Sequence, residues 1–208
     1  MEPTGRRPVS AVPQQEYLLQ GSIMDNSCEV LLHRLRGLCD NSELTPENFN
    51  DYEMAYQIRG PTGTPLVLRA RQALDYPGNP WHLRYIGQPE VGDKNRPTLV
   101  RSSIDVSTSK NLVQFLTELG FRLESEFVLK GQVFRKGRMK IIVAKVYQLL
   151  QQGNPKNLEP ISQSHLVELS VVAPSGQDAL ADEVKSFAEQ LKPLVQLEKI
   201  DHRRLQHI

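Results

Sequence analysis

Apolar and polar residues alternate along much of this 208-residue chain, a pattern typical of half-buried β-strands. Turn clusters rich in Pro and Gly separate several of these segments and support their assignment as strands. Two of them flank the sequence PTGTP at 61–65, which predicts a hairpin. We expect strands at 16–23, 53–59, 66–73, 81–87, 98–106, 121–135, 139–150 and 165–173.

Three other segments repeat with the period of an α-helix. The first covers 26–40, with Asn26 as expected cap and Glu29 where a capping box places it. The second follows a cap near 107–109 and ends at Gly120, and the third covers roughly 177–192. The expected buried positions are Cys28, Leu31, Leu32, Leu35 and Leu38, then Leu112, Phe115, Leu116 and Leu119, and finally Leu180, Val184, Phe187, Ala188 and Leu191.

Three helices are too few to cross over between eight strands, so parallel pairing is not favoured. The pattern predicts an α+β fold: a mainly antiparallel, eight-stranded β-barrel with about three helices packed on it. We expect a single barrel domain at 16–205 and a short tail at 206–208. The Pro-rich segment 1–15 predicts a disordered lead-in.

The expected strand 139–150 is apolar on both faces. An antiparallel strand with one wet face should alternate cleanly, so both faces must be covered. Helices of the same domain can cover one face, and either the barrel interior or a second protein covers the other. We therefore expect a charge at Ile142 or Val146 to weaken assembly or folding.

Composition argues against several classes of protein. The formal net charge is +1, without the overall basic bias of many nucleic-acid-binding domains. No window of about 18 apolar residues predicts a membrane helix, and 1–15 has no signal-peptide core. Cys28 and Cys39 lie on one expected helix, about 16 Å apart and too distant for a disulfide, which favours a reducing compartment, cytosol or nucleus.

Catalytic motifs are missing from the sequence. It contains no GxGxxG, GxxxxGK[ST], HExxH or GxSxG, and its five histidines have no zinc-site spacing. We therefore nominate no catalytic, cofactor-binding or metal-binding residue, and expect no enzyme activity, cofactor or small-molecule ligand.

One enzymatic alternative is a metal-dependent triphosphate tunnel phosphohydrolase. Such enzymes carry paired glutamates (ExExK) on the first strand and usually another pair near the last. This chain offers Glu16 alone and then only Glu168, with Glu124 and Glu126 sharing a strand face. Two divalent ions would lack ligands, so we expect background phosphate release with Mn²⁺ or Mg²⁺. The basic residues along the strands are interpreted mostly as a solvated face: Arg69, Arg71, Arg84, Arg101, Arg122, Lys130, Arg135 and Lys145.

The second alternative is nucleic-acid binding through the basic run FRKGRMK at 134–140. Such a run is usually a solvated turn, and we expect no direct nucleic-acid contact. A steep salt dependence of DNA or RNA binding would indicate otherwise.

Long segments of the chain resemble one family closely. They are EYLLQGSIMD, LLHRLRGLCD, WHLRYIGQPEVGDKNR, NLVQFLTELGFRLESEFVLKGQVFRKGRMKI, LVELSVVAPSGQ and FAEQLKPLVQLEKID. Together they cover about 16–205 and are similar to the subunit 18 family of the Mediator complex, the coregulator of RNA polymerase II.

The resemblance implies a non-enzymatic subunit of the Mediator head module in the nucleus. It implies a heterodimer with subunit 20, a bound C-terminal helix of subunit 8, and contacts with other head subunits. The link to RNA polymerase II is then indirect, in transcription regulation and activation. It also implies a barrel similar to that of the triphosphate tunnel enzymes, without their catalytic glutamates.

Overall fold

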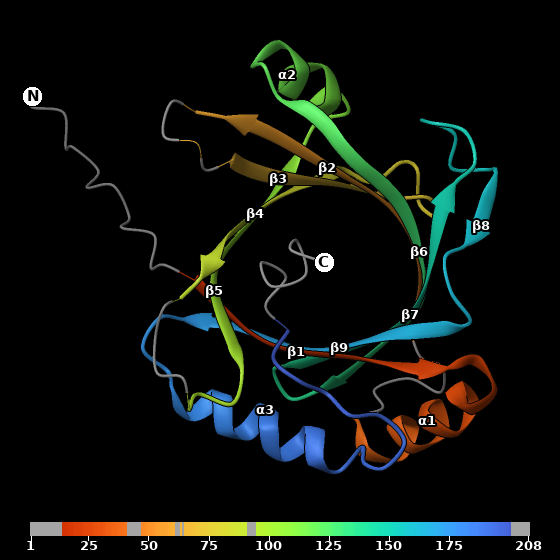
Figure 1. Cartoon of the computed structure of the whole chain (residues 1–208), viewed down its shortest axis with the longest axis vertical. Helices are drawn as coiled ribbons and strands as arrows, with labels where there is room; N and C mark the ends of the chain where they lie inside the picture. The colour runs from red at the N-terminus through yellow and green to blue at the C-terminus, as the bar shows by residue number, and fades with distance from the viewer. Residues whose placement is uncertain (1–13, 41–46, 61–62, 64, 91–94, 201–208) are drawn as a thin grey trace, which may run out of the picture.

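The computed structural model describes residues 14–40, 47–60, 63, 65–90 and 95–200, whose strands close into an antiparallel β-barrel (Figure 1). In these residues the barrel order is β6-β2-β3-β4-β5-β1-β9-β7, and β6 pairs with β7 to close the ring. A ninth strand, β8, pairs with the end of β7. The elements are β1 (Gln14–Met24), α1 (Asp25–Leu38), β2 (Glu47–Arg59), β3 (Pro65–Ala73), β4 (Trp81–Pro89), β5 (Leu99–Thr108), α2 (Leu112–Glu118), β6 (Arg122–Lys136), β7 (Met139–Leu149), β8 (Leu158–Pro160), β9 (Ser164–Pro174) and α3 (Ala179–Glu189).

The α+β class and the eight-stranded antiparallel barrel are therefore confirmed. The expected hairpin at 53–73 forms between β2 and β3. The sequence did not predict β8, because three residues are too short for an alternating pattern to be visible. Strand β2 begins at Glu47, inside an expected loop, and β1 begins at Gln14. Most of the expected lead-in and all of the expected tail, 1–13 and 206–208, lie outside the described residues.

Helix α1 begins differently from the prediction. Asn26 is not its cap: the cap position is Met24, which has no side-chain capping bond, and the expected capping box is wrong. The first turn is held by tertiary contacts instead, since the Asp25 N–H donates to the Gln163 carbonyl at 3.1 Å. The expected stripe is buried, with Leu38 half-buried at its end. Both cysteines are buried free thiols, and burial raises the pKa of Cys39 to about 11.

Helix α2 confirms half of its predicted stripe. Leu112 and Leu116 are buried, but Phe115 and Leu119 are exposed, because the helix lies on the barrel with only one narrow side. The expected cap at 107–109 is also wrong, since the cap position is Asn111. Gly120 does take the predicted left-handed conformation, with φ of +92°, which a side chain would strain.

Two hydrophobic clusters lie on the outside of the barrel, and helices cover both. One joins α1 and α3 to the outer faces of β1, β7 and β9, and all five positions of the predicted α3 stripe belong to it. The other lies under α2. Figure 1 shows α1 and α3 along one side of the ring and α2 at the other.

Strand β7 answers the question raised by its two apolar faces. Ile141 and Val143 belong to the cluster under α1 and α3. Ile142 therefore points the other way, into the barrel lumen, where its cross-strand neighbour is Glu168. The second apolar face of β7 therefore lines the barrel interior.

Candidate functional site

The lumen of the barrel is lined by charged residues. On β1, Tyr17 and Leu19 pack outward against the helices, so Glu16 and Gln20 point inward. The same alternation and the cross-strand registers bring charges inward from five more strands. These are Asp51, Glu53, Arg69, Arg71, Arg84, Arg101, Asp105 and Glu168.

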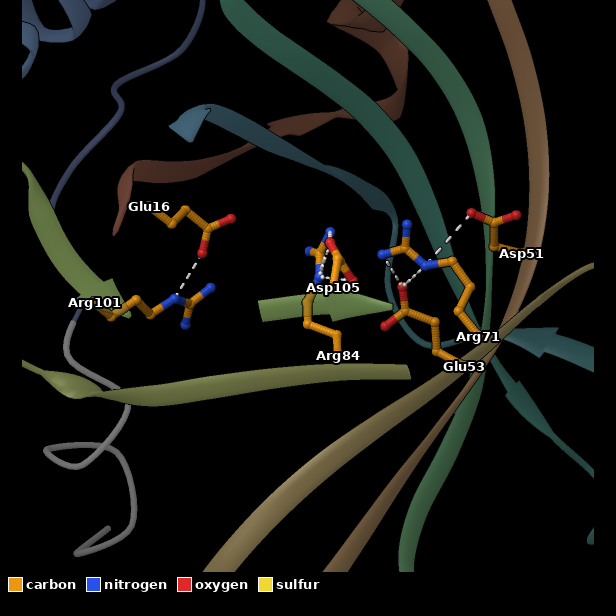
Figure 2. A network of polar contacts seen from close by, with 7 residues as sticks. All are labelled: Glu16, Asp51, Glu53, Arg71, Arg84, Arg101 and Asp105. Carbon is orange, nitrogen blue, oxygen red and sulfur yellow. Dashed lines mark hydrogen bonds and ion pairs between the residues drawn. The ribbon is translucent and has the colours of Figure 1, made fainter. Parts of the chain in front are cut away.

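Three ion pairs join neighbouring strands across this lining (Figure 2). Arg101 Nε donates to Glu16 Oε2 at 2.7 Å, with side chains only 12% and 7% exposed. Arg71 Nε donates to Glu53 Oε1 at 2.8 Å and also lies 3.7 Å from Asp51 Oδ2.

The third pair is Arg84 with Asp105, in which Arg84 Nε lies 2.9 Å from Oδ2 and 3.0 Å from Oδ1. The Asp105 side chain is 45% exposed, so this pair borders solvent. Burial tends to raise the pKa of Asp105, but the hydrogen bond and charge of Arg84 outweigh it, and the pKa is lowered.

Glu168 has no basic partner at salt-bridge distance among the described residues. Gln20 Nε2 donates a hydrogen bond to its Oε1. Enclosure by the barrel raises the pKa of Glu168, and this effect outweighs the lowering by Gln20. Burial similarly raises the pKa of Asp51 and lowers that of Lys140, which also feels the positive charges of Arg71 and Arg84.

This donor set does not fit a pair of divalent cations. An arginine bonds to each of Glu16, Glu53 and Asp105, and a guanidinium beside a carboxylate opposes a metal ion there. In the part of the chain that the structure describes, no three His, Cys, Asp or Glu residues gather where they could hold a metal.

Three of the eight basic residues do not fit the solvated-face interpretation. Arg71, Arg84 and Arg101 are held in ion pairs of the lumen, so for them that interpretation is wrong. Arg69 also faces the lumen, but it is exposed, which agrees with the interpretation. Sequence reasoning also missed Asp51, Glu53 and Asp105, which face the arginines. The available signal was the predicted hairpin, because its register places Glu53 directly opposite Arg71.

The remaining charged candidates lie elsewhere. Lys145 bonds to Asp25, Arg135 approaches Glu47 at 3.5 Å, Lys130 lies over the Tyr147 ring, and Arg122 is exposed. Glu126 accepts from the Tyr52 hydroxyl outside the lumen, and Glu124 is exposed.

The basic run at 134–140 is dispersed by the fold. Lys136 Nζ lies 3.2 Å from Asp40, Arg138 donates to Gln177, and Lys140 turns into the lumen. The run therefore does not present one continuous basic surface.

A second candidate site is an outer surface that the helices leave open. We call it the bare wall: Leu66, Tyr85, Ile104 and Val106, on the outer faces of β3, β4 and β5. It is bordered by half-buried Leu68 and Leu83, which pack against the cluster under α2. Ile104 and Val106 are 56% and 46% exposed, although the sequence predicts a shared apolar face with buried Val100. The outward positions of these three strands, as described, carry no charged residue. Depletion of charge is typical of the core of a protein interface.

None of the helices that the structure describes is long and apolar enough to cross a membrane.

Comparison with known proteins places this chain in one family. The model of the family described as Med18 protein matches residues 15–207. A zebrafish (Danio rerio) relative named Mediator of RNA polymerase II transcription subunit 18 is 58% identical, over 95% of this chain and 98% of its own length. A Drosophila melanogaster relative of the same name is 55% identical, over 93% and 89%.

Solved structures share the fold at low sequence identity. One described as the Schizosaccharomyces pombe Mediator head module matches with a TM-score of 0.70 and 16% identity, over 89% of this chain and 98% of that one. A structure described as a putative adenylate cyclase from Vibrio parahaemolyticus matches with a TM-score of 0.54 and 14% identity, over 92% and 98%. At these identities the likeness concerns the fold alone.

Proposed function

Since the chain belongs to the Med18 family, we propose that it serves the Mediator head module as a non-catalytic docking subunit, with the bare wall as its main contact surface. The partners we propose are Mediator subunit 20, as a heterodimer, and the C-terminal helix of subunit 8. Through them the chain supports RNA polymerase II transcription in the nucleus.

The observation that carries this proposal is the uncovered, uncharged bare wall. Exposed Ile104 and Val106 lie side by side with Tyr85 and Leu83 on neighbouring strands. Burying such a surface contributes about 25 cal/mol of free energy for each Å² of apolar area removed from water. An apolar surface left exposed therefore favours association with another protein.

The lumen supports a non-catalytic role for a separate reason. Its three ion pairs neutralise Glu16, Glu53 and Asp105 together with three of the four lumen arginines. A tunnel-type phosphohydrolase needs several free carboxylates for its metal ions, and three of the lumen carboxylates are bonded to arginines instead.

An affinity pull-down of the tagged chain from nuclear extract, quantified by mass spectrometry, tests the proposal. We expect the other Mediator subunits at stoichiometric amounts with the wild-type chain. Ile104→Asp should lower their recovery at least about tenfold, because it buries a charge in an apolar contact.

Ile161→Asp is the matched control. Ile161 is also an exposed isoleucine, 57% against 56%, but it lies beside β8 and away from the bare wall. It should leave recovery unchanged. Equal recovery of the Mediator subunits with Ile104→Asp and with the wild type would contradict the role of the bare wall. A wild-type chain that is recovered without other Mediator subunits would contradict the docking role itself.

A further inference from the structure

Among the described residues, one strand of the barrel has a long edge without a pairing partner. β1 pairs with β5 only from Gln15–Leu18 against Leu99–Ser102. β5 continues to Thr108, still paired with β4 on its other side. Within the described residues, no strand pairs with the β1 side of β5 after Ser102.

The backbone groups along this edge can be assigned from their neighbours. The Val100 carbonyl accepts from the Glu90 N–H at 2.8 Å, so even-numbered residues of β5 direct their backbone groups toward β4. Because these directions alternate along a strand, the N–H and C=O groups of Asp105 and Ser107 point away from β4. They point to the side where no described strand lies.

The other half of the same seam is closed, which makes the contrast informative. Beyond its pairing with β5, β1 exchanges two backbone hydrogen bonds with the segment after α3, between Gln20 and Glu198 at 2.9 and 2.8 Å. Gly21 permits this approach, since a Cβ there would lie 2.4 Å from the Gln196 carbonyl oxygen. The described chain provides no such cover for β5.

The sequence of this edge also lacks common protections against pairing. Natural edge strands are often blocked by Pro, Lys or a bulge. Residues 103–108 read SIDVST, and the only bulge in this pair of strands lies on β4 between Ile86 and Pro89. The single charge, Asp105, turns inward to Arg84. Outward-facing Ile104 and Val106 extend the bare wall to the edge itself.

We propose that a partner polypeptide of the head module adds an extended segment as an antiparallel strand to β5, opposite residues 104–108. This rests on the proposed function and names its mode of contact. The segment has alternating character, with apolar side chains outward beside Ile104 and Val106 and polar ones inward beside Asp105. Main-chain hydrogen bonds provide the affinity for the added strand. Contacts of its outward side chains with the bare wall provide the sequence specificity.

A second copy of this chain is a poorer occupant. Two β5 edges paired antiparallel about the centre of the free segment bring the two Asp105 carboxylates near each other. Like charges at such positions destabilise a strand pair. A different polypeptide avoids this repulsion.

Ser107→Pro is the variant that tests the inference. Proline removes the Ser107 N–H, which points away from β4 along the open edge of the sheet. Sheets tolerate proline on such edges. The variant should keep its melting temperature near that of the wild type, yet bind the recombinant head-module subunits about tenfold more weakly or worse. Ser107→Ala keeps the N–H, and its binding should match the wild type.

Hydrogen exchange on the wild-type chain provides a second measurement that needs no variant. The amides of Asp105 and Ser107 should exchange rapidly in the free chain and slowly in the assembled module. The amides of Ile104 and Val106, which face β4, should be protected in both.

The outcomes separate this inference from the function it rests on. An assembled module with Asp105 and Ser107 still exchanging rapidly, or full binding by a folded Ser107→Pro chain, would overturn strand addition and leave the docking role intact. Failure of the wild-type chain to assemble would overturn the docking role. A homodimer abolished by Ser107→Pro would show that the occupant is a second copy, against the proposal.

Discussion

Two outer faces of the same barrel differ in whether helices of the chain cover them. The face of β1, β7 and β9 lies under α1 and α3, and Leu169 there is fully buried among helix side chains. The bare wall of β3, β4 and β5 is also apolar, yet Ile104 and Val106 remain exposed. The fold completes one face by itself and leaves the other for a partner. Apolar residues therefore stabilise the chain on one face and, in our account, the assembly on the other.

The largest expected effect tests the covered face. Leu169→Ala should lower the free energy of unfolding by about 3–5 kcal/mol, because it opens a cavity among fully buried side chains. Leu66→Ala on the bare wall should cost less than about 1 kcal/mol, since that side chain already meets water. Equilibrium urea unfolding measures both, and equal losses would contradict the contrast between the faces.

The next effect contrasts two lumen ion pairs. Arg101→Ala leaves the buried Glu16 carboxylate without its partner and should cost about 2–4 kcal/mol. Arg84→Ala leaves Asp105, which reaches solvent at the edge of the bare wall, and should cost about 1 kcal/mol. The same unfolding measurement applies. A greater loss of stability for Arg84→Ala than for Arg101→Ala would contradict the view that the Arg101–Glu16 pair is the more buried of the two.

One substitution made inside and outside the barrel gives a smaller contrast. Ile142→Asp places a carboxylate in the lumen next to Glu168 and should destabilise the fold by about 2 kcal/mol. Ile104→Asp should change stability by less than about 0.5 kcal/mol while weakening assembly. Thermal melting of both variants checks this. A stable Ile142→Asp chain would contradict the inward placement of that side chain.

The smallest effect is a pH dependence from Glu168. Its pKa is raised in the folded chain, so the folded state binds this proton more tightly than the unfolded state does. The carboxylate therefore disfavours folding increasingly as pH rises from the unfolded pKa through the folded pKa. Glu168→Gln keeps the bond from Gln20 and should stabilise the chain more at pH 7 than at pH 4. Urea unfolding at both values checks this, and a larger gain at pH 4 would contradict the sign.

Sequence patterns predicted the elements better than they predicted the lining of the barrel. Alternation and helical period located β7 and α3 because their buried stripes are long. The same patterns place Glu53 and Arg71 on the polar faces of their strands. They do not show whether a polar face points to solvent or into a lumen. That depends on pairings between strands far apart in the sequence, such as β2 with β6 and β1 with β9, which are needed to close the ring. The free edge of β5 was not predictable for the same reason, since it depends on where β1 ends its pairing.

The most direct test of the account places a photoreactive side chain at position 106 on the bare wall, with position 161 as the control, and irradiates the assembled head module. The account predicts covalent products between position 106 and another Mediator subunit, identified by mass spectrometry, and few or none from position 161. Products from position 161 only, with position 106 remaining in contact with solvent, would contradict the claim that the bare wall is the docking surface.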